Sequence, residues 1–211
     1  MWENMFYLPF LKIFQFLSFH LKDPVLTIFV LTLFVKILFF PLYLQAIKTQ
    51  KKVREINLKI KEIERKFKED PQKKTKELIS LFKEEKINPF FGLIFFVQIP
   101  IFFALYRVFV EGIFGMKERK FLKIIDLSLP SIFLAALAAL FQYFFSKMNF
   151  SLNFDQNKKD FFQRQLPIFF SFFTFFILSK IPAAISLYWL SFNALSIIEN
   201  YYVAKRDNRK N

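Results

Sequence analysis

The sequence predicts an all-α membrane protein with five transmembrane helices and a cytoplasmic helical hairpin between the first and the second. Of its 211 residues, 55% are hydrophobic and 35 are Phe, an apolar content too high for a soluble surface. The net charge is +14, and most of the basic residues lie between the apolar stretches. This distribution indicates the orientation of a membrane protein rather than a nucleic-acid-binding surface. The five apolar stretches are 25–47, 89–110, 129–145, 166–182 and 183–203.

The first 47 residues predict two different helices. Residues 1–23 are expected on the extracytoplasmic side, with an amphipathic helix at 6–20 in the membrane interface and a frayed terminus as the alternative. Residues 24–47 are the predicted first transmembrane helix. Its apolar run would extend about 34 Å as a helix, enough to cross a hydrocarbon core of about 30 Å.

Residues 48–87 have a different composition and predict a cytoplasmic basic helical hairpin. Their apolar side chains recur at steps of three and four, the spacing of a helix that packs along one narrow stripe. Asp70 and Pro71 break the pattern, and a second, shorter amphipathic helix follows. A solvated charged loop is the alternative. With 14 basic and 8 acidic residues, the segment favours anionic lipid head groups or ribosomal RNA. The stripes comprise Val53, Ile56, Ile60, Ile63 and Phe67, then Leu78, Ile79, Leu81 and Phe82.

Residues 88–203 are expected to hold transmembrane helices two to five, with a tight turn at Lys180-Ile181-Pro182, and 204–211 form a basic cytoplasmic tail. Twenty-two Lys and Arg lie in 48–86, 146–165 and 204–211, whereas 7 lie in the segments predicted on the opposite side. Because cytoplasmic loops carry the excess of basic residues, the N-terminus is predicted outside and the C-terminus in the cytoplasm.

Lys36 is the main candidate functional residue, since it is the one formal charge in the stretch 25–47. A cation at mid-bilayer costs about 2.5–3.5 kcal/mol on insertion scales, so such a residue is a functional-site hypothesis by default. It is also too deep for its side chain to reach a head group. Two interpretations stay open: a polar cavity within the membrane, or a structural ion pair with another residue.

Enzymatic and metal-dependent functions are not expected. The chain has one His, no Cys and three scattered Gly, so it lacks a Cys/His catalytic or metal-binding set and a glycine-rich phosphate loop. No cofactor is therefore predicted.

Four motifs in register resemble the Oxa/YidC/Alb membrane protein insertase family, in the short bacterial form without a large extracytoplasmic domain. The resemblance covers residues 25 to 203. The motifs are Leu31-Thr32-Leu33-Phe34-Val35-Lys36 continuing to Leu42; Asn88-Pro89-Phe90 with Gln98-Ile99-Pro100; Asp126-Leu127-Ser128; and Pro182-Ala183-Ala184 with Tyr188-Trp189 and Asn193.

The resemblance implies a hydrophilic intramembrane groove that carries a positive charge, here Lys36. It implies polar groove residues Thr32, Gln98 and Gln142, and substrate-contacting residues Tyr188, Trp189, Ile177 and Ile181. Each has a structural alternative. The two glutamines could join helices by hydrogen bonds, the aromatic pair could be interfacial or core residues, and the isoleucines could face lipid.

The chain departs from the family pattern at several positions. Lys36 stands where relatives usually have Arg, which keeps the charge but loses the bidentate fork. Ser171 and Ala184 stand where many relatives have Pro and Gly, and Gln142 lies near the polar position of the third helix.

The function predicted from this resemblance is insertion and folding of nascent membrane proteins in the bacterial cytoplasmic (inner) membrane. Nascent membrane proteins and the lipid bilayer are the expected partners, with the Sec translocon, the ribosome and the signal recognition particle receptor as further candidates, and no DNA. The rival functions are a small membrane transporter or channel, and a membrane-anchored assembly factor.

Overall fold

The structure, a computed structural model, describes residues 7–87, 94–116, 119–153 and 161–208. Within these ranges the chain forms eight α-helices and one two-stranded antiparallel sheet. It divides into two compact units, residues 1–38 with 100–211, and residues 39–99. Helices α2 (Pro24–Glu55) and α5 (Ile94–Phe114) run from one unit into the other.

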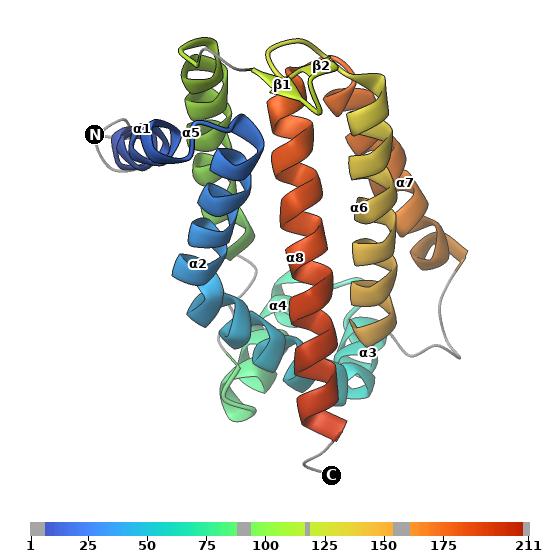
Figure 1. The fold of residues 1–211 in the computed structure, drawn as a ribbon. Coiled ribbons are helices and arrows are strands. Elements are labelled where there is room, and N and C mark those ends of the chain that lie inside the picture. Colours follow the sequence, from blue (N-terminus) through green and yellow to red (C-terminus); the bar gives the residue numbers. More distant parts are fainter. Residues whose placement is uncertain (1–6, 88–93, 117–118, 154–160, 209–211) are drawn as a thin grey trace. The chain divides into compact units, whose positions relative to one another are not determined.

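Three helices form one side of the first unit. Helix α6 (Ile132–Asn153) packs against α7 (Phe161–Leu178) and α8 (Ala183–Asn208), and α7 also contacts α8 (Figure 1). Ala135 and Ala138 are fully buried on α6. Small side chains at a helix contact allow close approach of the backbones, which is how membrane helices gain packing energy without a hydrophobic driving force.

The predicted turn between the fourth and fifth apolar stretches is present, because α7 ends at Leu178 and α8 begins at Ala183. The first N–H groups of a helix have no partner within it. Here the N–H groups of Ala183 and Ala184 donate to the carbonyl oxygens of Leu129 and Leu127, at 2.9 and 3.0 Å. Both alanines are fully buried, so these bonds fix the start of α8 against the segment that precedes α6.

A short hairpin precedes α6. Strands β1 (Lys120–Phe121) and β2 (Ile125–Asp126) pair antiparallel, and Leu122 and Lys123 at its tip take positive φ angles of 50° and 62°. The backbone N–H of Ser128 donates to Asp126 at 2.8 Å. This hydrogen bond, followed by the Ser128 hydroxyl and the nearby basic side chains, holds the pKa of Asp126 below its ordinary value.

The predicted N-terminal amphipathic helix is present as α1 (Leu8–Leu21), and it packs against α5. Gly112 provides the room, because a Cβ there would lie 2.4 Å from the ring of Phe14. The Phe14 ring also meets Phe109 edge-on, with 6.1 Å between ring centres. At one end of the contact, Tyr7 donates to Glu111, which also pairs with Arg107 at 2.8 Å.

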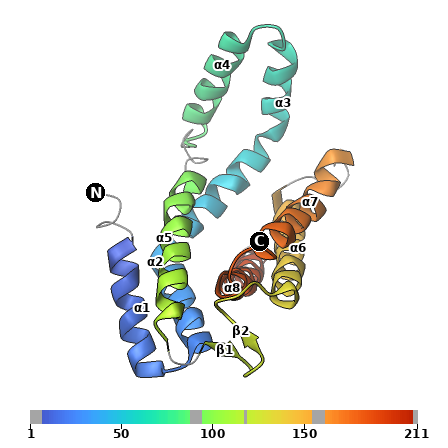
Figure 2. The ribbon, with the colours of Figure 1, turned by 90° about the horizontal axis from the view of Figure 1, so that it is seen from above.

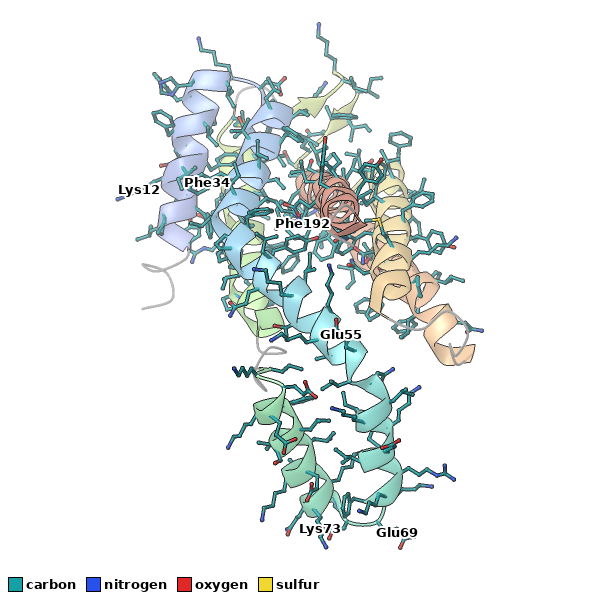
Figure 3. The ribbon with its side chains drawn as sticks, turned by 90° about the horizontal axis from the view of Figure 1, so that it is seen from below. Lys12, Phe34, Glu55, Glu69, Lys73 and Phe192 are labelled. Atoms are coloured by element: carbon teal, nitrogen blue, oxygen red, sulfur yellow. The ribbon has the colours of Figure 1, made fainter. Side chains whose placement is uncertain are left out.

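The second unit contains the hairpin predicted for 48–87, formed by α3 (Asn57–Lys66) and α4 (Pro71–Glu84), which lie side by side and antiparallel (Figure 2). Helix α2 does not end at residue 47 as predicted but continues to Glu55, because charged residues alone do not stop a helix. The break at residues 70–71 is confirmed: Asp70 caps α4 by accepting from the N–H of Lys73 at 2.9 Å. Figure 3 shows Glu69 and Lys73 at the tip of this hairpin.

Six residues of the two predicted apolar stripes, together with Ile87, form the core of the hairpin, whereas Ile79, which was predicted to belong to the second stripe, is 39% exposed. Ile56, Leu81 and Ile87 are buried, and Val53, Ile60, Ile63 and Phe82 pack around them. Two exposed ion pairs, Lys59–Glu85 at 2.7 Å and Lys74–Glu64 at 3.9 Å, cross from one helix to the other. Exposed ion pairs contribute little to stability, because water screens the charges and both long side chains lose freedom, so the apolar cluster is the main source of stability.

Two helices among the described residues are long and apolar enough to cross a membrane by length and composition, at Pro24–Val53 and Ile132–Asn149. Two shorter apolar helices lie at Leu8–Leu21 and Gln165–Leu178. The mostly helical fold is confirmed, and the count of five spans stays a prediction.

The hairpin core predicts a difference between two substitutions close together in the sequence. Ile56 is 6% exposed and Leu58 is 64% exposed. Ile56→Ala should destabilise the hairpin by about 2 kcal/mol and raise amide hydrogen exchange in α4 about 30-fold. Leu58→Ala should change the exchange by less than about threefold. Equal exchange in the two variants of the full chain in detergent would show that the cluster does not hold the hairpin together.

Candidate functional site

Helix α8 carries a buried polar face, although it begins in apolar sequence. Asn193, Ser196 and Asn200 are each 1–2% exposed and follow at steps of three and four. This spacing puts them on one side of the helix. Because polar groups away from water need hydrogen-bond partners, the side chains facing this stripe define the candidate site.

Lys36 on α2 meets the middle of this face. Its Nζ donates to Glu199 Oε2 and to Ser196 Oγ, each at 2.6 Å. The ammonium also lies 4.3 Å from the centre of the Phe192 ring, whose negative face attracts a cation. In Figure 3, Phe192 lies on the side of α8 toward α2. Lys36 is therefore enclosed by three groups of α8.

The ion pair is largely removed from solvent: the side chain of Lys36 is 9% exposed and that of Glu199 is 19% exposed. Desolvating two charges is costly, and their attraction repays this only with close contact and further hydrogen bonds. Both conditions are met here, since Ser196 supplies the second oxygen. Removing one partner of such a pair typically costs about 3–5 kcal/mol, because the other charge is left buried.

A second polar cluster lies between α6 and α8, centred on Gln142. The amide oxygen of Gln142 accepts from Trp189 Nε1 and from Asn193 Nδ2, each at 3.0 Å. Its amide nitrogen donates to Ser146 Oγ at 3.0 Å. Farther along the same two helices, Asn200 donates to Asn149 at 3.3 Å. Gln142 therefore takes the interhelical role that was one of its two predicted interpretations, and its role in a groove stays a prediction.

The remaining predicted site residues lie in different surroundings. The fully buried Thr32 donates to the carbonyl oxygen of Ile28 in its own helix at 2.7 Å. Tyr188 is 2% exposed and packs between the rings of Phe109 and Phe192. The half-buried Trp189 meets Phe102 edge-on at 5.7 Å.

The two predicted sliding residues are more accessible. Ile177 near the end of α7 is 38% exposed, and Ile181 in the turn before α8 is half-buried. Gln98 belongs to α5, but its side chain lies outside the described residues. The structure thus brings Gln142 and Trp189 into one network and Lys36 into another.

Sequence reasoning missed Glu199, the partner of Lys36, and Ser196 beside it. A signal for Glu199 was available, because it is the one carboxylate inside the five predicted spans. A buried lysine needs an opposite charge or a dipole, so a search for a lone acidic residue would have found it. Ser196 carries no comparable signal, since serine is common in membrane helices. Among the described residues, no three His, Cys, Asp or Glu side chains are placed to hold a metal ion.

Comparison with known proteins decides the family. The model of the family described as "60Kd inner membrane protein" matches residues 16–210. The chain belongs to this family. The insertase resemblance seen in the motifs is therefore confirmed, as is the placement among inner membrane proteins.

Relatives with a stated function are proteins named membrane protein insertase YidC. Those of Burkholderia lata and Paraburkholderia phymatum are 34% identical over 183 and 186 residues, and that of Pseudomonas putida is 32% identical over 183 residues. These matches cover 85–87% of this chain but only 32–33% of the relatives, so the chain spans about a third of their length.

A solved structure shares the fold. The crystal structure titled an active YidC insertase with its first transmembrane domain resolved matches with a TM-score of 0.70 and 25% identity. The match covers 96% of this chain and 47% of that one. The arrangement of helices described above is thus that of a YidC-like membrane protein.

The Gln142 cluster predicts a spectroscopic change. Gln142→Leu would leave the Trp189 and Asn193 donors without this acceptor, at a cost of about 1 kcal/mol. In a Trp2→Phe background, where Trp189 is the remaining indole, its fluorescence emission should shift to the blue and the Tm in detergent should fall. Gln45→Leu, at an exposed position, is the control and should change neither. Unchanged emission in the Gln142 variant would mean that the cluster does not form.

Proposed function

We propose that this chain is a membrane protein insertase, a non-enzymatic catalyst that moves short polar segments of nascent membrane proteins into and across the bilayer. The observation that carries the proposal is Lys36, the one formal charge in the apolar stretch 25–47, which lies within the helical bundle and is paired with a carboxylate that is 19% exposed. The names of its relatives support the same conclusion.

The barrier to insertion is the transfer of a hydrated, often acidic segment through hydrocarbon, where charges and backbone groups lose water. A hydrophilic groove formed around Lys36, with Thr32, Gln98 and Gln142, would shorten that dry path and attract carboxylates. The apolar helix of the substrate then partitions into lipid, which supplies the driving force. No chemical step or cofactor is needed. Tyr188, Trp189, Ile177 and Ile181 are proposed to contact the arriving substrate.

The outer surface of the first unit supports a membrane setting. Helix α7 exposes a row of large apolar side chains, each 53–70% exposed. Such a surface would be an aggregation liability in water but is suited to lipid tails. The row consists of Ile168, Phe169, Phe172, Phe173 and Phe176.

The proposed topology has five spans, with the N-terminus outside and the C-terminus and the hairpin in the cytoplasm. In this arrangement, residues 1–23 lie on the extracytoplasmic side and 204–211 form the cytoplasmic tail. The basic hairpin is then available to anionic head groups, or to a ribosome, the Sec translocon or the signal recognition particle receptor. A transporter is the weaker alternative, since it usually requires an internal repeat and the sequence has none that we detect.

The topology is tested with single cysteines in this Cys-free chain. Lys123 at the tip of the β1–β2 hairpin and Ser80 on α4 are both exposed. In sealed vesicles of known orientation, an impermeant maleimide should label Lys123→Cys and Ser80→Cys from opposite sides. Labelling of both from the same side would contradict the five-span arrangement.

The insertase function is tested in liposomes that contain only this chain. A single-span substrate carries zero, one or two Asp in its translocated segment, and insertion is measured by protease protection. Lys36→Arg should retain activity, because the charge is kept. Lys36→Gln should lose about tenfold on the two-Asp substrate and less on the neutral one. Lys36→Leu should impair insertion and, because it leaves Glu199 without its partner, should also destabilise the bundle.

Equal activity of the wild type and all three variants on every substrate would contradict a role for Lys36. A matched control is Lys147→Gln, which removes an exposed lysine from α6 and should leave insertion unchanged.

A further inference from the structure

Ser196 Oγ and Glu199 Oε2, which both accept hydrogen bonds from Lys36, differ in how much they can move. The hydroxyl of Ser196 donates to the carbonyl oxygen of Phe192 at 2.7 Å, so its hydrogen is engaged and its lone pair faces the lysine. Ser196 is 1% exposed. This acceptor is part of the helix and cannot leave without a change of rotamer inside the core.

Glu199 is the more accessible partner. Its side chain is 19% exposed, and its neighbours on α8 are among the exposed residues of the chain: Ile198 is 52% exposed and Tyr201 is 61% exposed. A glutamate side chain has three rotatable bonds, so its carboxylate can turn outward while the helix stays in place. The ammonium of Lys36 therefore has one acceptor that is fixed, the hydroxyl of Ser196, and one acceptor that can turn away, the carboxylate of Glu199.

A lysine paired with a carboxylate presents no net charge to its surroundings. An approaching polypeptide segment then gains little from Lys36 unless it replaces Glu199. A substrate carboxylate can make this exchange without leaving the ammonium unpaired in the membrane, because one carboxylate takes the place of another. A neutral segment cannot, since displacing Glu199 would leave a buried cation.

We propose that Glu199 is an internal competitor for Lys36, which an acidic residue of the substrate displaces during insertion. Glu199 thereby sets the specificity of the site: it lowers the advantage of acidic segments and restores a neutral pair when the substrate departs. The inference rests on the insertase function proposed above and adds to it a residue on α8 that regulates access to the charge.

The test compares insertion of the two-Asp and neutral substrates by the purified full chain in liposomes. The measured quantity is the ratio of the two initial rates. Glu199→Gln removes the competing charge and keeps nearly the same side-chain shape. It should raise this ratio about threefold or more, which is the size of effect expected from removing one charge interaction. The double variant Lys36→Gln with Glu199→Gln should lose the gain. Glu111→Gln, which removes a carboxylate paired with Arg107 on α5, should keep the wild-type ratio.

A ratio unchanged by Glu199→Gln, or a gain that persists in the double variant, would overturn the proposal. If Glu199→Gln does not fold, Glu199→Asp replaces it: the shorter side chain should give an intermediate ratio, and the wild-type ratio would count against the competitor.

Failure of the insertase function itself is separated by a binding measurement. A fluorescent peptide with the two-Asp segment is titrated into the detergent-solubilised protein. Its Kd should fall threefold or more in Glu199→Gln, whether or not the liposomes show insertion. Equal affinity for the wild type and the variant overturns the role of Glu199, whereas a wild type that binds the peptide but inserts no substrate contradicts the insertase function alone.

Discussion

The ion pair between Lys36 and Glu199 is the constraint on which the membrane part of this protein depends. A charge in hydrocarbon has to meet an opposite charge or water, so α2 and α8 must keep a register that joins two residues 163 positions apart in the chain. Ser196 and the ring of Phe192 also contact the ammonium. Leaving one of these ions buried without its partner costs more free energy than most single apolar contacts contribute. The ion pair therefore restricts the arrangement of the helices more than any one apolar residue does.

The rest of the site follows from the polar face of α8. Toward α6, the polar groups of that face make hydrogen bonds with amide side chains: Gln142 accepts from Trp189 and from Asn193. Toward α2, it is satisfied by the lysine. The same helix thus uses neutral hydrogen bonds on one side and a charge on the other. The neutral side is suited to permanent packing, whereas an ion pair with a partly exposed carboxylate can exchange its partner.

The sequence predicted the parts that depend on local pattern. The apolar stripe from Val53 to Ile63, the break at Asp70 and the tight turn before Ala183 all appear in the structure, because period and capping act over a few residues. The end of α2 was misplaced, since no breaker stands between residues 47 and 55. The partner of Lys36 was missed because pairing across the bundle has no local period, and the signal that was available, a lone carboxylate in the predicted spans, lies 163 residues away in the sequence. The role of Gln142 stayed open for the same reason, as hydrogen bonds between helices cannot be read from spacing.

The most direct test of this account is a double-mutant cycle on the stability of the full chain in mixed micelles. The free energy of unfolding is measured for the wild type, Lys36→Met, Glu199→Gln and the double variant. Each single variant leaves one member of the pair without its partner, so each should be destabilised by about 3–5 kcal/mol. The double variant should be destabilised by less than the sum, with a coupling energy of at least about 1.5 kcal/mol. Additive effects, with a coupling below about 0.5 kcal/mol, would contradict the central role of the pair.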